Sequence, residues 1–425
     1  MTLPVVFRHL SRDGWLLFAT RFVRLFAYGS LSVVLVFYLV GIGLNETQTG
    51  LLLTLTLIGD TVVSLLLTTR ADRIGRRRML TIGAILMAAA GLVFASTSHF
   101  ALLLVAGTIG VISPSGHEVG PFLSIEQAAL SHIVTDRDRT ETFAWYTLVG
   151  SIATALGALV AGISTRVLLD TGIAPVLSYR VVVVLYAFLG LVLAALFQRL
   201  SRTAEAATLG EKRALQLTLA GFSGLDRSRD TVVKLSGLFA LDSFGGGFVI
   251  QSFAAYWFHL RFGVDPGTLG AIFFWANIFA GLSALAASRL AARIGLVRTM
   301  VVTHLPSNIL LILVPLMPTL SSAIAVLLIR FSISQMDVPT RQSFVMAVVP
   351  PEERSAAAGV TSVARTVGAS LSPLFAGMLF AHPALINVPF FIAGTLKSAY
   401  DLTLYRAFVA VQPPEEHRLS DRALH

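Results

Sequence analysis

Charged side chains occur at a few positions inside long apolar stretches of this sequence, where a charge is energetically costly. Arg21 and Arg24 lie three residues apart in the apolar stretch 15–40, and this spacing puts both on one face of a helix. Asp242 interrupts another apolar stretch, residues 232–258. Ionisable groups in such segments either neutralise one another or take part in function. These positions are therefore the first candidates for chemistry.

Four acidic residues in such stretches are candidates for carrying a proton. Apolar surroundings drive a carboxylate toward its neutral form, so that it can titrate near physiological pH. Glu118 and Asp242 are the leading candidates, and Glu126 and Asp337 are the other two. A carboxylate that exchanges a proton for a cationic partner can couple proton movement to the movement of another solute.

The basic residues in the same stretches are candidates for binding a substrate. Arg330 lies near the middle of its apolar stretch, where a guanidinium can hold an anionic group through charge-assisted hydrogen bonds. Polar and aromatic side chains in neighbouring stretches can also line a binding site. The candidate substrate-binding residues are Arg21, Arg24, Arg330, Arg341, Arg365, Gln251, Tyr256 and Asn277.

A purely structural alternative remains open for the charged residues. In that interpretation, Arg21 or Arg24 pairs with Glu118 or Glu126, and Asp337 pairs with Arg341 or Arg365. Two further pairs have the i,i+4 spacing that brings side chains together on one helix. These local pairs are His304 with Asn308 and Lys397 with Asp401.

The composition indicates the environment in which these residues are held. Of the 425 residues, 55% are hydrophobic and 13% are charged, whereas soluble domains carry about 25% charged residues. The net charge of +9 does not indicate nucleic-acid binding, because the cations lie between apolar stretches. Cysteine is absent, which excludes disulfides and cysteine-based metal sites. The lipid bilayer is therefore the expected solvent.

Twelve apolar stretches are long enough to cross a bilayer, which requires about 20 residues each. A polar segment, 201–231, separates the first six from the last six. We expect an all-α integral membrane protein with a six-helix bundle at 1–200, a linker at 201–231, a second bundle at 232–411 and a tail at 412–425. The expected spans are 15–40, 49–69, 79–97, 100–131, 140–165, 180–200, 232–258, 267–290, 297–317, 320–348, 354–381 and 385–410.

Lysine and arginine are distributed unevenly among the connecting loops. They gather at both termini and after the second, sixth and eighth spans, and they are almost missing after the first, third, ninth and eleventh. Because cytoplasmic loops are enriched in cations, we expect both termini and the linker on the cytoplasmic side of an inner or plasma membrane.

The two halves of the sequence resemble each other weakly. The segment that starts at Ile125 aligns with the segment that starts at Thr340 at one constant offset. A shared offset together with a shared topology indicates a parallel repeat. The matched positions are Gln127 with Gln342, Arg139 with Arg354 and Gly162 with Gly377.

The loop between the second and third spans reads TTRADRIGRRRML. It resembles the signature loop of the major facilitator superfamily, roughly G-x-x-x-D-R-x-G-R-[RK], with Thr68 at the position of the leading glycine. The resemblance implies a transporter whose two halves rock about a midplane site lined by the first, fourth, seventh and tenth spans. It also implies that the loop acts as a conformational latch; the alternative is a simple topology anchor. The matching residues are Asp72, Arg73, Gly75, Arg76 and Arg77.

No enzyme motif accompanies these features. The sequence contains no GxxxxGK[ST] loop for ATP, and no metal or cofactor site is expected. We therefore expect a monomeric secondary transporter rather than an enzyme, with a small-molecule substrate, a proton and the bilayer as partners, working as a proton-coupled antiporter in efflux. Two alternatives remain: a transporter of small organic anions that uses the intramembrane arginines, and a transporter-like sensor or lipid scramblase.

Overall fold

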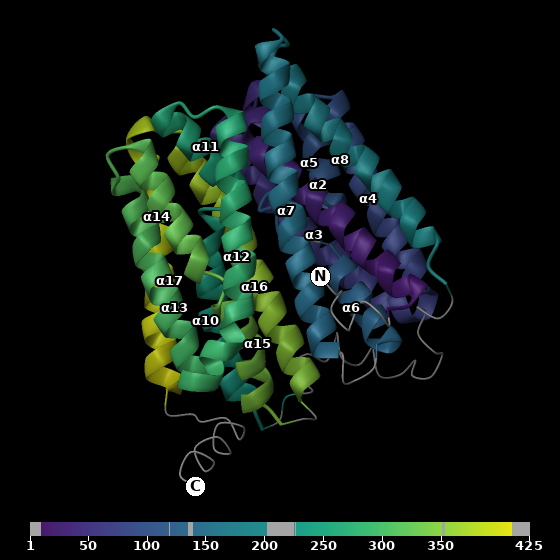
Figure 1. Ribbon diagram of the computed structural model, residues 1–425, viewed down its shortest axis with the longest axis vertical. Helices are drawn as coiled ribbons and strands as arrows, with labels where there is room; N and C mark the ends of the chain where they lie inside the picture. Colours follow the sequence, from purple (N-terminus) through teal and green to yellow (C-terminus); the bar gives the residue numbers. More distant parts are fainter. Residues whose placement is uncertain are drawn as a thin grey trace, which may run out of the picture. The chain divides into compact units, whose positions relative to one another are not determined.

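Helices make up the regular structure of the part of the chain that the computed structural model describes (Figure 1). The described residues are 10–118, 120–134, 139–201, 225, 227–350 and 353–409. The expected linker and tail lie almost entirely outside these ranges.

The first half of the chain forms helices that follow the predicted spans. Asn45 caps one of them, α3, with a reciprocal pair of hydrogen bonds to Gln48, and Gly75 ends it with a φ of 113°. The helices are α2 (Arg12–Gly41), α3 (Glu46–Ile74), α4 (Arg76–Ser96), α5 (Phe100–Ile109), α6 (Phe122–Ile133), α7 (Arg139–Asp170) and α8 (Pro175–Gln198).

The second half repeats this pattern. Thr319 caps α14 through Ser322, and two short 3-10 turns complete the connections at Val314–Leu316 and Pro383–Leu385. The helices are α10 (Arg229–Gly247), α11 (Gln251–Phe262), α12 (Pro266–Ile294), α13 (Leu296–Leu313), α14 (Leu320–Ile333), α15 (Asp337–Val348), α16 (Arg354–Phe380) and α17 (Val388–Phe408).

Ten helical stretches in the described ranges are long and apolar enough to cross a membrane. The two remaining predicted spans, 100–131 and 385–410, are not among these ten. One is interrupted into α5 and α6, and the other, α17, carries Lys397, Asp401 and Arg406. The twelve-helix arrangement expected from the sequence is thus consistent with the structure.

The break between α5 and α6 follows from the local sequence. The α5–α6 connection contains Pro114 and Pro121, which lack a backbone donor. It also contains Gly116 and Gly120, whose φ values of 71° and 80° lie in the left-handed region that favours glycine. The predicted span 100–131 is therefore interrupted in its middle. The expected placement of Glu118 on a helix was wrong, because it lies on the irregular segment.

Close backbone contacts between helices depend on glycine. Gly29 of α2 packs on the backbone of Thr154 in α7, and Gly157 of α7 packs on the backbone of Phe26 in α2. Small residues let helices approach closely where no water is present to drive association. These two glycines therefore set the separation between α2 and α7.

The described chain divides into two compact units. The first unit combines Met1–Glu211 with Ile250–Ile278 and Pro373–His382, and the second contains the remainder. Within the first unit, Gly162 of α7 lies against Gly270 of α12, and Gly50 of α3 lies against Gly377 of α16. Each of these contacts joins helices from different halves of the sequence.

The α2–α7 contact leads to a testable prediction. A methyl group on Gly157 would come within 2.9 Å of the Ser30 nitrogen, and would press on the backbone of Phe26. We expect Gly157→Ala to lower stability by about 1–3 kcal/mol, as overpacking does, measured as the thermal unfolding of purified protein. The matched control is Gly237→Ala, where no heavy atom lies within 4 Å of the added carbon. Equal destabilisation by both changes would contradict the close contact.

Candidate functional site

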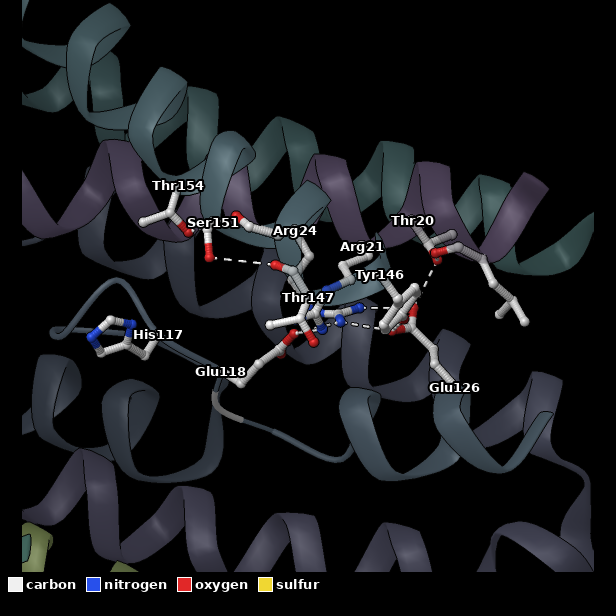
Figure 2. A network of polar contacts seen from close by, with 12 residues as sticks. Thr20, Arg21, Arg24, His117, Glu118, Glu126, Tyr146, Thr147, Ser151 and Thr154 are labelled. Atoms are coloured by element: carbon white, nitrogen blue, oxygen red, sulfur yellow. Dashed lines mark hydrogen bonds and ion pairs between the residues drawn. The ribbon is translucent and has the colours of Figure 1, made fainter. Parts of the chain in front are cut away.

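Two arginines of α2 bind two carboxylates in the first unit (Figure 2). Arg24 reaches Glu126 with contacts of 2.8 Å and 2.6 Å and Glu118 with a contact of 3.0 Å. Arg21 reaches Glu118 at 2.5 Å. We call Arg21, Arg24, Glu118 and Glu126 the first cluster. Its charges balance, as burial of ions in a low-dielectric interior requires.

Neighbouring side chains complete the hydrogen bonds of the first cluster. Thr20 donates its hydroxyl to Glu126 at 2.7 Å, and Tyr146 donates a second hydroxyl to the same carboxylate. The Arg21 guanidinium also lies 4.3 Å from the centre of the Tyr146 ring. These contacts hold Glu126, on α6, from two other helices, α2 and α7.

The two carboxylates of the first cluster differ in their access to solvent. The Glu126 side chain is 0% exposed, whereas that of Glu118 is 17% exposed. Glu118 lies on the irregular α5–α6 connection, which can move more easily than a helix. Glu118 is therefore the member of this cluster that is better suited to exchange a proton.

A second group of charges surrounds Asp242 in the second unit. The carboxylate of Asp242 lies 2.6 Å from Lys397 Nζ, 3.1 Å from Arg341 Nη1 and 3.7 Å from His304 Nε2. Arg341 also contacts Asp337, one helical turn away, at 3.0 Å. One carboxylate thus faces three basic partners contributed by α17, α15 and α13.

A further carboxylate extends this group. Asp401 contacts His304 Nδ1 at 2.8 Å and accepts a hydrogen bond of 2.8 Å from the side-chain amide of Asn308. Because the two nitrogens of His304 face Asp401 and Asp242, the imidazole connects both acids. We use the name second cluster for Asp242, His304, Asp337, Arg341, Lys397 and Asp401.

Two arginines near the second cluster have no carboxylate bound to them within the described ranges. Arg330 lies over the Phe331 ring at 5.0 Å, and its Nε has no hydrogen-bond partner. Arg365 donates from Nε to the Ser243 hydroxyl at 3.4 Å. Their positive charge is therefore not balanced by a direct ion pair.

The three uncharged candidates for substrate binding lie in the first unit. Gln251 donates to Ser32 at 2.7 Å and accepts from Asn277 at 3.1 Å. Tyr256 donates its hydroxyl to Glu46 at 2.8 Å. Their polar atoms are thus engaged with other protein groups, and Gln251 and Tyr256 contact helices of the first half.

The signature loop is described only in part. Gly75 separates α3 from α4, Arg76 is buried, and Arg77 donates to the Leu200 carbonyl at 3.4 Å. The side chains of Asp72 and Arg73 lie outside the described residues. The latch assigned to Asp72, Arg73, Gly75, Arg76 and Arg77 therefore remains a prediction.

The sequence correctly predicted several ion pairs. Arg21 and Arg24 pair with Glu118 and Glu126, and Arg341 pairs with Asp337. The expected partners of Lys397 and Asp401 were wrong. Although their spacing allows a local pair, Lys397 binds Asp242 and Asp401 binds His304.

The leading proton candidates do not share one cluster of charges. Glu118 and Asp242, the leading proton candidates, belong to different clusters in different units. The sequence analysis also missed Asp60, a buried carboxylate of α3. Asp60 could have been identified from the sequence, because it is a lone acidic residue in the apolar span 49–69.

Comparisons with known proteins show the family to which the chain belongs. The family model described as Major Facilitator Superfamily matches residues 17–373 and 238–423. The uncharacterized membrane protein YJR124C of Saccharomyces cerevisiae is 34% identical over 432 residues, which cover 96% of each chain.

Solved transporter structures share the fold at low sequence identity. The nucleoside transporter NupG has a TM-score of 0.73 at 14% identity, covering 94% of this chain and 99% of its own. A D-xylose–proton symporter has a TM-score of 0.69 at 16% identity, covering 92% and 97%.

The fold and the intramembrane charges define a multi-pass membrane transporter rather than an enzyme. The chain belongs to the major facilitator superfamily, and it is a secondary transporter.

The first cluster provides a prediction about stability. Arg24→Met leaves the buried Glu126 without a cation, and we expect a loss of about 3–5 kcal/mol, as for other broken buried pairs. Arg24→Met combined with Glu126→Gln leaves only the Arg21–Glu118 pair, whose charges balance. The double variant should therefore be more stable than Arg24→Met alone in thermal or chemical unfolding. A double variant that is less stable than Arg24→Met would contradict this account of the cluster.

Proposed function

We propose that this chain couples the movement of a small organic molecule to the movement of a proton, through alternating access of its two halves. The observation that carries the proposal is the position of Asp242 among Lys397, Arg341 and His304. A carboxylate with several basic partners can change partners when its charge changes.

The proposed coupling step is a proton transfer to Asp242. A proton on Asp242 removes one negative charge from the second cluster. Arg341 then keeps Asp337 as its carboxylate partner, and Lys397 loses its ion pair. An unpaired ammonium in a dry interior is unfavourable, so this state favours either a change in conformation or the arrival of an anionic group.

The first cluster can support the same cycle. Glu118 shares two arginines with Glu126, so protonation of Glu118 leaves both arginines dependent on Glu126. We propose Glu118 and Asp242 as the principal proton carriers, with Glu126 and Asp337 as their fixed counterparts.

The remaining expectations belong to the same proposal. We propose a monomer with both termini cytoplasmic, bundles at 1–200 and 232–411, and the signature loop as the latch between conformations. The cation-rich loops after the second, sixth and eighth spans support the orientation. Efflux by proton exchange is the proposed direction.

Charge balance favours organic anions as the substrate class. Arg330 and Arg365 add positive charge near the second cluster without a bound carboxylate in the described ranges. A substrate carboxylate or phosphate would supply the missing negative charge. The acidic groups compared are Asp242, Asp337 and Asp401. The basic groups are the buried Arg341 and Lys397 and the partly buried Arg330 and Arg365, and His304 is able to add a further positive charge.

Proton coupling can be tested with purified protein in liposomes. We expect Asp242→Asn to abolish substrate accumulation driven by a pH gradient, because the variant cannot exchange a proton at this position. Exchange of substrate between equal concentrations inside and outside the liposomes should continue. This exchange would show that the variant is folded. The control is Asp170→Asn, which removes an exposed carboxylate. Unchanged gradient-driven accumulation in Asp242→Asn would contradict the proposal.

The substrate class can be tested by thermal shift. We expect small organic anions to raise the melting temperature of the wild type by mass action, and neutral or cationic compounds to have no such effect. Arg330→Gln and Arg365→Gln should each reduce the shift caused by anions. Stabilisation by hydrophobic cations that is unaffected by both substitutions would instead support a cation exporter.

A further inference from the structure

Asp60 is a buried acid that belongs to neither cluster. It lies near the middle of α3, and it is 6% exposed. Its Oδ1 atom has no hydrogen-bond partner, and no lysine, arginine or histidine in the described ranges forms an ion pair with it. Asp60 is thus unlike Glu126 and Asp242, each of which contacts at least one basic side chain.

The surroundings of Asp60 offer little to offset a negative charge. The backbone N–H of Gly120, in the α5–α6 connection, is within hydrogen-bonding reach of the carboxyl group. The ionisable side chains that interact with Asp60 are Glu118, which is itself acidic, and the phenols of Tyr28 and Tyr186.

In the described residues, the helices packed on α3 supply no direct counter-ion. Helix α2 is one of them, and its Arg21 and Arg24 are bound to Glu118 and Glu126. Helix α5 carries no ionisable residue, and the only charged residues of α4 are at its start, Arg76–Arg78. Helix α6 contributes Glu126, which is bound to Arg24 of α2, and carries His132 near its end. An ionised Asp60 would therefore be a buried charge without a basic partner in the described residues, which costs far more than a neutral carboxyl group.

We propose that Asp60 is a proton-binding site, occupied when the chain has the conformation described here. The proposal rests on the proposed function in one respect, because it assigns a proton to the same transport cycle. It differs in placing that proton on α3, outside the two ion-paired clusters.

Two hydroxyl groups lie one helical turn from Asp60 on either side. Thr56 and Ser64 are at i−4 and i+4, on the same face of α3. The hydroxyl oxygens of both residues lack a hydrogen-bond partner in the protein, as Asp60 Oδ1 does. These three groups place polar atoms on one face of α3, next to a carboxyl group that has no basic partner in the described residues.

The site is connected to the first cluster by the α5–α6 connection. Gly120 of this segment faces Asp60, and Glu118 of the same segment binds Arg21 and Arg24. Loss of the proton would put a second negative charge near Glu118. The repulsion would raise the free energy of the connection in this position, so that proton release at Asp60 favours its rearrangement.

Isotope-edited infrared spectroscopy of the full-length protein in lipid vesicles tests this proposal directly. A protonated carboxyl group has a C=O stretch that a carboxylate lacks, and labelling of aspartate carboxyls separates aspartate from glutamate. We expect an aspartate C=O band at neutral pH that disappears at high pH. Asp60→Asn should remove this band, and Asp242→Asn should retain it, because Asp242 is held as a carboxylate by Lys397 and Arg341.

The outcomes distinguish this site from the proposed function. A band that is missing in the wild type, or that persists in Asp60→Asn, overturns the proton site even where proton-driven transport is observed. A band that depends on Asp60 supports the site even where liposomes show no proton-driven transport, which would refute only the coupling.

The melting temperature of Asp60→Asn provides a second measurement. Because asparagine resembles the neutral acid in size, the variant should match the wild-type melting temperature at neutral pH. At high pH its melting temperature should fall less than that of the wild type.

Discussion

The whole arrangement depends on one electrostatic constraint, which is that a charge removed from water must be neutralised within the protein. In the first cluster, Arg24 and Glu126 are fully buried, and they are tolerable only because each supplies the other's counter-charge. In the second cluster, Asp242 has Lys397 and Arg341 within salt-bridge distance. The helices that carry these residues are held together by the charges as well as by apolar packing.

Two of the breaks between helices lie next to charged residues. The break between α5 and α6 contains Glu118, so a carboxylate that binds two arginines lies on a segment without helical hydrogen bonds. The break between α14 and α15 separates Arg330 from Asp337. Broken helices at membrane depth are tolerated where the freed backbone groups find partners in the protein or in a polar cavity. Their association with buried charges supports a moving part rather than a passive packing fault.

The three unusual acids have different electrostatic surroundings, and this difference suggests a division of labour. Glu126 is fully buried and bound by side chains of two other helices, which suits a fixed counter-ion. Asp242 has several basic partners, which suits exchange between them. Asp60 has no basic partner in the described ranges, which suits a proton. The three acids thus differ in how their charge is offset within the described residues.

The sequence by itself determined the fold class, because long apolar stretches must be helical in lipid. The need for neutrality also predicted that Arg21 or Arg24 pairs with Glu118 or Glu126, but it left open which arginine binds which acid. The interruption of the 100–131 span was only suggested by its prolines and glycines. Tertiary structure alone decided that Lys397 binds Asp242 rather than Asp401, and that no basic residue of the described ranges forms an ion pair with Asp60. The physical reason is that spacing along one helix defines which face a side chain occupies, whereas the packing of different helices decides what that face meets.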